Sequence, residues 1–375
     1  MQIVVNTRLL LKNRLEGIGW FSYQTLIRIT RANPDVHFVF LFDRPFDEEF
    51  IFSDNITPLI ISPPARHPLL YYAFFQHSVK QVLKKLKPDA FFSPDGFLSL
   101  GANCTQIPVI HDINFHHHPK DTRWLTSKYY NYYFPRFAET AKRIITVSEF
   151  SKKDIVDSFH IHPQKIDVVY NGINDGFTLT STAEKEVVRS RFSQGKDYFL
   201  HVGSLHPRKN IAGLIRAFSA FKRQTGSDKK LVLAGPEFWG LVEIKKALKE
   251  SDYQCDIVFT GRLSQTDLAG LVSSAFCLCL VSFYEGFGIP LIEAMACGVP
   301  VISSNRSALP EIGGDAALYV DPDSITSITE ALVKLSSDSV LADQLITKGL
   351  LQKEKFSWDQ SANHLWQSIQ QSIDK

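Results

Sequence analysis

Two glutamates flank a short glycine-rich stretch, Glu285-Gly286-Phe287-Gly288-Ile289-Pro290-Leu291-Ile292-Glu293, which follows a strand-like apolar run. Gly286 and Gly288 let a ligand approach the backbone, and Pro290 is typical of the first turn of a helix. The free amides and positive dipole at a helix start attract a phosphate group, and carboxylates accept hydrogen bonds from sugar hydroxyls. The stretch therefore predicts an anion site with a carboxylate at each end. The alternative is that both glutamates only stabilise the start of the helix.

A basic segment, His201-Val202-Gly203-Ser204-Leu205-His206-Pro207-Arg208-Lys209-Asn210, also joins a strand to a helix start. Lys209 and Arg208 can stabilise a diphosphate leaving group, and Ser204 can donate its hydroxyl to it. An isolated basic pair in a loop is usually only solvated. Open α/β sheets, however, bind ligands at the carboxyl ends of their strands, and this position favours a binding role.

The first half of the chain offers two weaker candidates. Gly17 and Gly19 follow the first apolar run and open a helical pattern, which is the arrangement of a short phosphate-binding loop. Ser22 stands where a dinucleotide fingerprint has its last glycine, so a nicotinamide-dependent dehydrogenase is disfavoured. His111, at the end of another apolar run, is a candidate for contact with a sugar or an acceptor; the alternative is a purely structural histidine.

Two patterns resemble metal sites but predict none. Asp321-Pro322-Asp323 is similar to an Asp-x-Asp metal signature, and His116, His117 and His118 are consecutive. We expect the aspartates to cap a helix starting near Ile325. Three consecutive histidines cannot all reach one ion without strain. We therefore expect no required metal.

These residues must be positioned by elements that alternate in kind. Short β-rich apolar runs recur with helical segments between them, which is typical of α/β domains with mainly parallel sheets. A first series of runs lies at 3–5, 37–42, 56–61, 90–92, 108–110, 144–147 and 168–170, and a second at 198–202, 231–234, 257–260, 277–281, 299–303 and 318–320. The length of 375 residues also favours two domains, with a cleft between them.

A turn-forming and small polar stretch separates the two series, so we place the domain boundary near 172–190. After residue 320 only helical patterns follow. The last one, Trp358–Ile373, has an apolar face at helical spacing and must dock on another surface, with the first domain as the expected partner.

Composition excludes several classes of protein. A formal charge of +2 does not suit a nucleic-acid binder, which must neutralise many phosphates. The odd number of cysteines, 5, has no metal spacing and fits a reducing compartment. The N-terminus has no signal-peptide pattern, and we expect a cytoplasmic protein. The stretch Leu69–Leu86, aromatic at first and then lysine-rich, predicts either a helix on an anionic membrane surface or a core-facing helix with a basic end.

With Glu285 and Glu293 eight positions apart in this glycine-rich setting, the chain resembles the family 4 retaining glycosyltransferases of the GT-B fold, and in particular their mannosyltransferase-like members. The resemblance covers nearly the whole chain. Its other motifs, in order, are Gly17–Gly19, His111-Asp112, Val147–Ser151, Asn171–Ile173, Pro207–Asn210, Leu309–Ile312 and Phe356–Trp358.

The resemblance implies a GT-B architecture of two Rossmann-like domains whose parallel sheets face each other across a cleft. It implies an acceptor-binding domain at 1–175, a nucleotide-sugar-binding domain at 190–355, and a C-terminal helix at 356–375 that packs back on the first domain. Domain closure would then be part of catalysis.

Roles for single residues also come from the resemblance. It implies that Glu285 binds donor-sugar hydroxyls, that Glu293 holds the ribose and that Lys209 stabilises the diphosphate. His111 would contact sugar and acceptor. Gly17 and Gly19 would lie in a loop closing over the donor phosphates, and Gly286, Phe287, Gly288 and Ile289 in the donor site. Many members carry an arginine where this chain has Ser204, so the diphosphate charge would rest on Lys209 and Arg208.

The expected activity is transfer of a hexose from a nucleoside-diphosphate sugar, with GDP-mannose the first expectation and UDP-glucose close behind, to a hydroxyl of a saccharide or lipid-linked saccharide. Polysaccharide or O-antigen-type glycan synthesis is the expected setting, with peripheral contact to the inner membrane face as an option. Two alternatives remain open: a nucleotide-sugar epimerase of the same architecture, and a non-catalytic nucleotide-sugar-binding module.

Overall fold

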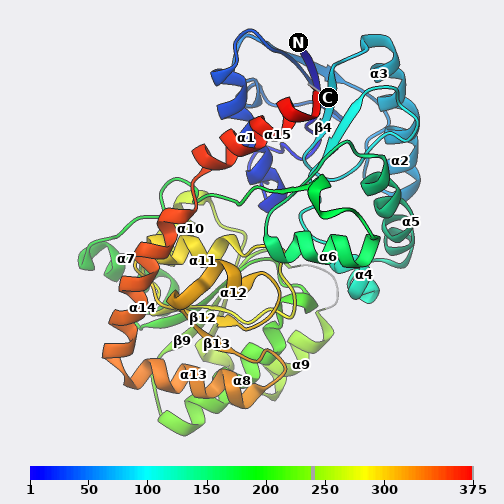
Figure 1. Cartoon of the computed structure of the whole chain (residues 1–375). Coiled ribbons are helices and arrows are strands. Elements are labelled where there is room, and N and C mark those ends of the chain that lie inside the picture. The colour runs from blue at the N-terminus through cyan, green and yellow to red at the C-terminus, as the bar shows by residue number, and fades with distance from the viewer. Residues whose placement is uncertain (238–240, 374–375) are drawn as a thin grey trace. The chain divides into compact units, whose positions relative to one another are not determined.

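The computed structural model describes residues 1–237 and 241–373, and the chain divides into two compact units. Unit 1 consists of Met1–Asn171 together with Ser357–Lys375, and unit 2 is Gly172–Phe356. Unit 2 is therefore inserted in the sequence of unit 1 (Figure 1).

Unit 1 is built on a parallel sheet with the strand order β3-β2-β1-β4-β5. Most of its strand residues are apolar and buried, as expected for a parallel sheet that helices cover on both faces, but in the edge strand at 56–60 only Ile56 is buried. They are β1 (Gln2–Asn6), β2 (His37–Phe42), β3 (Ile56–Ile60), β4 (Ala90–Ser93) and β5 (Thr105–Pro108). A separate parallel pair, β6 (Ile144–Thr146) and β7 (Ile166–Val168), is joined to this sheet through a single bridge between Val109 and Ile145.

The helices of unit 1 include one that is remote in sequence. They are α1 (Gly17–Ala32), α2 (Pro68–Tyr72), α3 (Lys80–Leu86), α4 (Asn114–His117), α5 (Trp124–Thr140), α6 (Glu149–Phe159) and α15 (Trp358–Ile373). A π-helical segment, Ala73–Val79, joins α2 to α3.

The last helix, α15, packs along α1 (Figure 1). Trp358 is buried and meets the ring of Phe21 edge-on at a centroid distance of 6.3 Å. Asp359 forms an ion pair with Arg28 at 2.5 Å, and the Ser361 hydroxyl donates to the Tyr170 carbonyl at 2.5 Å. The apolar face that the sequence assigns to Trp358–Ile373 is thus covered by unit 1.

Unit 2 repeats the design of unit 1 with a parallel sheet of order β10-β9-β8-β11-β12-β13. Numbered within its own unit, each sheet runs 3-2-1-4-5, the strand order of a dinucleotide-binding fold, and unit 2 adds a sixth strand. The strands are β8 (Tyr198–Val202), β9 (Lys230–Ala234), β10 (Ile257–Gly261), β11 (Cys277–Leu280), β12 (Val301–Ser304) and β13 (Ala317–Val320).

Helices pack around this second sheet, and a buried apolar cluster from α8, α13 and the central strands fills one side. The helices are α7 (Thr182–Ser193), α8 (Ile211–Thr225), α9 (Val242–Glu250), α10 (Gln265–Ser273), α11 (Ile289–Ala296), α12 (Leu309–Gly313), α13 (Ile325–Ser337) and α14 (Ser339–Gln352). Cys277 and Cys279 both belong to this cluster, as their alternation in the sequence predicts.

Three sequence expectations are corrected. Residues 108–110 do not form the fifth strand, because β5 ends at Pro108 and the chain then pairs with Ile145 instead. The strand expected at 168–170 lies at 166–168. The boundary between the units is at 171/172, at the start of the stretch 172–190 where the sequence places it, but residues 182–190 of this stretch belong to the helix α7, which Ser181 and Glu184 start with a capping box.

The stretch Leu69–Leu86 forms three helical segments rather than one helix. Phe74, Phe75, Val79 and Leu83 are buried in the core of unit 1, whereas Leu69, Leu70 and Tyr72 are exposed. No helix in the described part of the chain has both the length and the apolar character needed to cross a bilayer.

Candidate functional site

The basic segment and the first of the two glutamates come together at the point where the strand order of unit 2 reverses. Lys209 follows β8 and Glu285 follows β11, and these strands are parallel neighbours in the sheet. In open α/β sheets the crevice outside the strand ends at such a point is the usual ligand site. The sheet thus brings together two residues that are 76 positions apart in the sequence.

Glu285 is held by three side chains. Lys209 donates to Oε1 from Nζ at 2.6 Å, Ser282 donates to the same oxygen at 2.7 Å, and Arg208 donates to Oε2 at 3.0 Å. Arg208 also donates to the carbonyl of Tyr284 at 2.7 Å, and the amide of Glu285 donates to the Ser307 hydroxyl at 2.9 Å. Both the side chain and the backbone of this buried glutamate are fixed.

The charges around Glu285 decide its protonation. Burial alone raises the pKa of a carboxyl, but the positive charges of Lys209 and Arg208 outweigh burial and lower the pKa of Glu285 to about 2. The carboxylate is therefore ionised. Two cations against one carboxylate leave the cluster one net positive charge, which suits a diphosphate.

Glu293, on α11, is buried in a different environment. Its Oε1 accepts from Asn174 Nδ2 at 2.9 Å. Burial raises the pKa of Glu293 to about 8, and the hydrogen bond from Asn174 offsets this rise only in part. The two glutamates of one motif therefore differ in charge at neutral pH.

The loop between the two glutamates leads directly into α11. Gly288 immediately precedes the helix with φ +103°, and a Cβ there would lie 2.7 Å from Leu309 Cδ2, so glycine is required. Gly286 is buried, Ile289 begins the helix, and Pro290 occupies its first turn as predicted. Phe287 is buried and meets Phe356 edge-on at 5.7 Å. This ring contact anchors the loop.

Ser204 follows β8 in a turn that brings two backbones very close. A Cβ on Gly235, after β9, would lie 2.0 Å from the carbonyl oxygen of Gly203. His201, the fourth residue of β8, is fully buried and its Nδ1 lies 3.2 Å from the Cys279 carbonyl. Burial and the nearby charge of Lys209 lower the pKa of His201 to about 4. The imidazole of His201, near Lys209, is therefore neutral at neutral pH.

The candidates of the first half of the chain lie in unit 1. Gly17 and Gly19 are not in a loop but in the first turn of α1. A Cβ on Gly17 would meet nothing within 4 Å. Gly19 is buried, and a Cβ there would lie 3.1 Å from both Leu15 Cδ2 and the Leu9 carbonyl oxygen. Space at Gly17 and close packing at Gly19 therefore give the two glycines different roles.

His111 is held firmly in unit 1. Its Nε2 lies 2.8 Å from the Pro94 carbonyl, and its ring meets Phe21 edge-on at 5.1 Å. Burial lowers the pKa of His111, and the bond to Pro94 opposes this in part. With Nε2–H donating to Pro94, Nδ1 is an acceptor that a hydroxyl can use.

The two patterns that resemble metal sites are occupied by other interactions. Asp321 and Asp323 both bind Arg306, at 2.9 and 2.6 Å. Ser324, rather than an aspartate, caps α13, because its hydroxyl accepts from the Ser327 amide at 3.1 Å. His116 and His117 turn to different partners, Asn131 and Asp154. Within residues 1–237 and 241–373, no three His, Cys, Asp or Glu side chains are grouped for a metal.

The site includes four polar residues that the sequence did not predict: Ser282, Ser307, Asn174 and His201. Ser282 is only three positions before Glu285, and Asn174 lies in the Asn-Gly-Ile-Asn turn, so both had a positional signal. Ser307 follows β12, the parallel neighbour of β11, and reaches Glu285 from the carboxyl end of that strand, which only the fold reveals.

Comparison with known proteins agrees with this division of the chain. Residues 182–352 match the family "Glycosyl transferases group 1", and residues 16–177 match "Glycosyltransferase Family 4". Together the two matches cover most of both units.

The relatives point the same way. The O-antigen chain mannosyltransferase B of Escherichia coli is 28% identical over 364 residues, which are 93% of this chain and 94% of that protein. The O-antigen chain mannosyltransferase RfbU of Salmonella typhimurium is 29% identical over 60% of each chain. A solved sucrose-phosphate synthase from Thermosynechococcus elongatus has a TM-score of 0.79 at 18% identity, over 99% of this chain and 98% of that one. At 18% identity, this similarity to the sucrose-phosphate synthase shows that the two proteins share a fold.

Proposed function

Since the chain is a glycosyltransferase of the GT-B fold, with a family 4 domain followed by a group 1 domain, we propose that it transfers a hexose from a nucleoside-diphosphate sugar to a hydroxyl of a saccharide or lipid-linked saccharide, with retention of configuration. The observation that carries the proposal is the buried Glu285 carboxylate bound by Lys209 and Arg208 at the reversal of the strand order.

Mannose from GDP-mannose is the donor that the relatives favour, because two of them are O-antigen chain mannosyltransferases. Polysaccharide or O-antigen-type glycan synthesis follows as the setting. The proposal also places the enzyme in the cytoplasm with peripheral contact to the inner membrane face, where a lipid-linked acceptor would lie.

In the proposed mechanism unit 2 binds the donor. Glu285 accepts hydrogen bonds from the hexose hydroxyls, Glu293 binds the ribose, and Lys209 and Arg208 neutralise the diphosphate. Ser204 and the amides along Gly286–Ile289 complete the donor site. The cluster's single net positive charge supports this assignment, because the leaving group gains negative charge as the bond breaks.

The acceptor is assigned to unit 1, with His111 contacting it. A contact with the donor phosphates is assigned to the first turn of α1 at Gly17, where a Cβ would meet nothing, and Gly19 lets that turn pack closely against Leu9 and Leu15. The bond from the anomeric carbon to the diphosphate oxygen breaks, and a bond to the acceptor oxygen forms on the same face. The acceptor proton passes to the leaving diphosphate. No protein nucleophile and no metal is assigned to this step.

The first test compares Glu285→Ala and Lys209→Ala with the wild type in a transferase assay using GDP-mannose and UDP-glucose. Each variant should lose roughly 10²–10³-fold in turnover, the usual cost of removing a group that stabilises developing charge. Glu250→Ala and Lys249→Ala, on the exposed part of α9, are matched controls and should keep wild-type turnover.

Two outcomes would contradict the proposal. One is wild-type turnover in Glu285→Ala or Lys209→Ala. The other is conversion of the donor without any acceptor, followed by NMR, which would favour the epimerase. NMR spectra of the reaction with acceptor present report the anomeric configuration of the transfer product and so test retention.

A further inference from the structure

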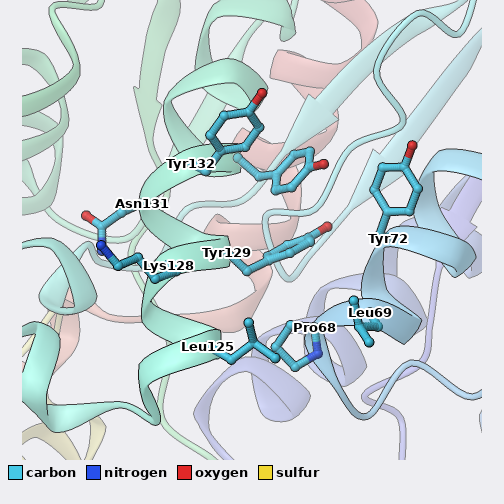
Figure 2. A pocket seen from close by; sticks show the side chains of 9 residues that line it. Pro68, Leu69, Tyr72, Leu125, Lys128, Tyr129, Asn131 and Tyr132 are labelled. Atoms are coloured by element: carbon cyan, nitrogen blue, oxygen red, sulfur yellow. The ribbon is translucent and has the colours of Figure 1, made fainter.

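An aromatic and aliphatic surface on unit 1 is left uncovered in this fold. It lies where α2 and α5 run side by side, and a pocket with a volume of about 610 Å³ opens between them (Figure 2). Leu69, Tyr72, Leu125, Tyr129 and Tyr132 line it. We call these residues, together with Leu70 and Trp124, the α2–α5 surface.

The exposure of this surface is high for apolar side chains. Trp124 is 72% exposed, Leu69 69% and Tyr132 53%, and Leu70, Tyr72 and Leu125 are also exposed. Large exposed apolar side chains that cluster in this way mark an interaction site, whereas scattered ones do not.

The two segments that carry the α2–α5 surface contain bases but no acids. From Pro63 to Pro88 the sequence contains no aspartate or glutamate, but it contains Arg66, Lys80, Lys84, Lys85 and Lys87. From Thr122 to Ala138 it again has no acid, with Arg123, Lys128 and Arg136 as bases. Asp121, just before α5, and Glu139, near its end, are the nearest acids in sequence.

Inside the pocket a hydrogen-bond donor has no partner. The Tyr129 side chain is 8% exposed, and its hydroxyl has no hydrogen-bond partner among the described residues. Its ring points across the pocket toward Tyr72 (Figure 2). Burial raises the pKa of Tyr129 far above its usual value, so the hydroxyl stays a donor. The hydroxyl oxygen has almost no solvent exposure, so an acceptor reaches it only when the side chains around it move.

From these observations we infer that the α2–α5 surface docks unit 1 on an anionic lipid bilayer. Leu69, Leu70, Trp124 and Leu125 would enter the acyl boundary, the tyrosines would lie at headgroup depth, and the basic residues would face the lipid phosphates. Tyrosine and tryptophan favour this interface, and each lysine or arginine near an anionic leaflet adds to the attraction. A protein partner would not require that the charged residues of its docking surface are all basic.

The inference rests on the proposed function only in taking a membrane as the partner, and it combines parts of the two alternatives that the sequence left open for Leu69–Leu86, a membrane-surface helix and a core-facing helix. Phe74, Phe75, Val79 and Leu83 of that stretch are core, and its exposed N-terminal part, α2, pairs with α5. This pairing joins two segments that are more than 50 positions apart in the chain.

Flotation with vesicles tests the inference on the full chain without any nucleotide sugar. Vesicles of phosphatidylcholine with about 30% phosphatidylglycerol should bind the protein, and vesicles of phosphatidylcholine alone should bind it at least tenfold less. Leu69→Ser/Trp124→Ser should lower binding to the anionic vesicles about tenfold. Arg123→Glu/Lys128→Glu should remove the preference for phosphatidylglycerol. Lys245→Glu/Lys249→Glu, exposed on α9 of unit 2, is the matched control and should bind like the wild type.

Equal binding to both vesicle types, or no binding to either, would overturn the inference. So would a dimer in light scattering that Leu69→Ser/Trp124→Ser dissociates, because a second copy would then be the occupant. Thermal shift by GDP-mannose tests the donor site separately. Flotation without a donor shift would sink the proposed function alone, and a donor shift without flotation would sink this inference alone.

Discussion

Glu285 and Glu293 belong to one motif, yet the pKa values of their side chains are shifted in opposite directions. Glu285 is buried against two cations and stays ionised. Glu293 is buried beside a neutral amide, and its pKa of about 8 keeps it protonated at neutral pH. The difference arises from the neighbours and not from burial, which both share. A ribose bound to Glu293 would therefore meet a group that can donate as well as accept a hydrogen bond.

This contrast makes stability depend on pH. The native state binds the Glu293 proton more tightly than the unfolded chain, where the pKa is near 4.5. The stabilisation is complete below pH 4.5 and is lost as pH rises toward 8. We expect the melting temperature of wild type to fall over this range more than that of Glu293→Gln, as measured by calorimetry without ligand. Parallel curves for the two proteins would contradict the raised pKa.

For single residues, the sequence predicts which side chains belong to the site better than it predicts the hydrogen bonds between them. Glu285, Lys209 and Arg208 were chosen because they follow strands, and the strands brought them within hydrogen-bond distance. The hydroxyl of Ser307 and the amide of Asn174 could not be predicted in the same way. Their contacts depend on how loops fold back over the strand ends, for which a single sequence holds no periodic signal.

At the scale of elements, the ends of β8 and β9 are closely packed. Gly203 and Gly235 abut there, and Gly235 has φ +149°. In Gly235→Ala the new Cβ would collide with a backbone carbonyl and displace the loop that carries Ser204 and Lys209. We expect a loss of about 2–4 kcal/mol of stability together with weaker nucleotide-sugar binding, both measured by thermal shift.

Gly195→Ala is the matched control for this substitution. Gly195 also has a positive φ, of +77°, but a Cβ there would have nothing within 4 Å. Only the conformational cost remains, about 1 kcal/mol. Similar losses in the two variants, with donor binding intact in both, would show that the contact between the strand ends is not needed.

Elements with a strong hydrophobic periodicity agree with the sequence prediction. Elements whose ends depend on which neighbouring strand the backbone pairs with do not. The spans of β8 and α15 agree with the sequence pattern, because each is a continuous apolar or amphipathic segment with clear ends. The fifth strand was misplaced because residues after Pro108 leave one sheet for another pairing. Leu69–Leu86 was predicted as one helix, and the π-helical segment within it has no sequence signature of its own.

At the scale of the molecule, α15 is the only part of unit 1 that follows unit 2. Trp358, 3% exposed, packs its ring edge-on against Phe21 of α1. We expect Trp358→Ala to cost about 3–5 kcal/mol and to lower the melting temperature of unit 1 in calorimetry. Trp124→Ala, at 72% exposure, is the control and should change stability by less than about 0.5 kcal/mol. Equal effects would mean that α15 is not needed for the fold of unit 1.

The position of α15 also has a consequence for the nascent chain. A ribosome makes the whole first sheet early, but the helix that covers α1 emerges only after all of unit 2, which is about half of these 375 residues, has been synthesised. Until then Phe21 and its neighbours lack their final cover. A chain that stops within unit 2 would therefore leave an apolar surface of unit 1 exposed to aggregation.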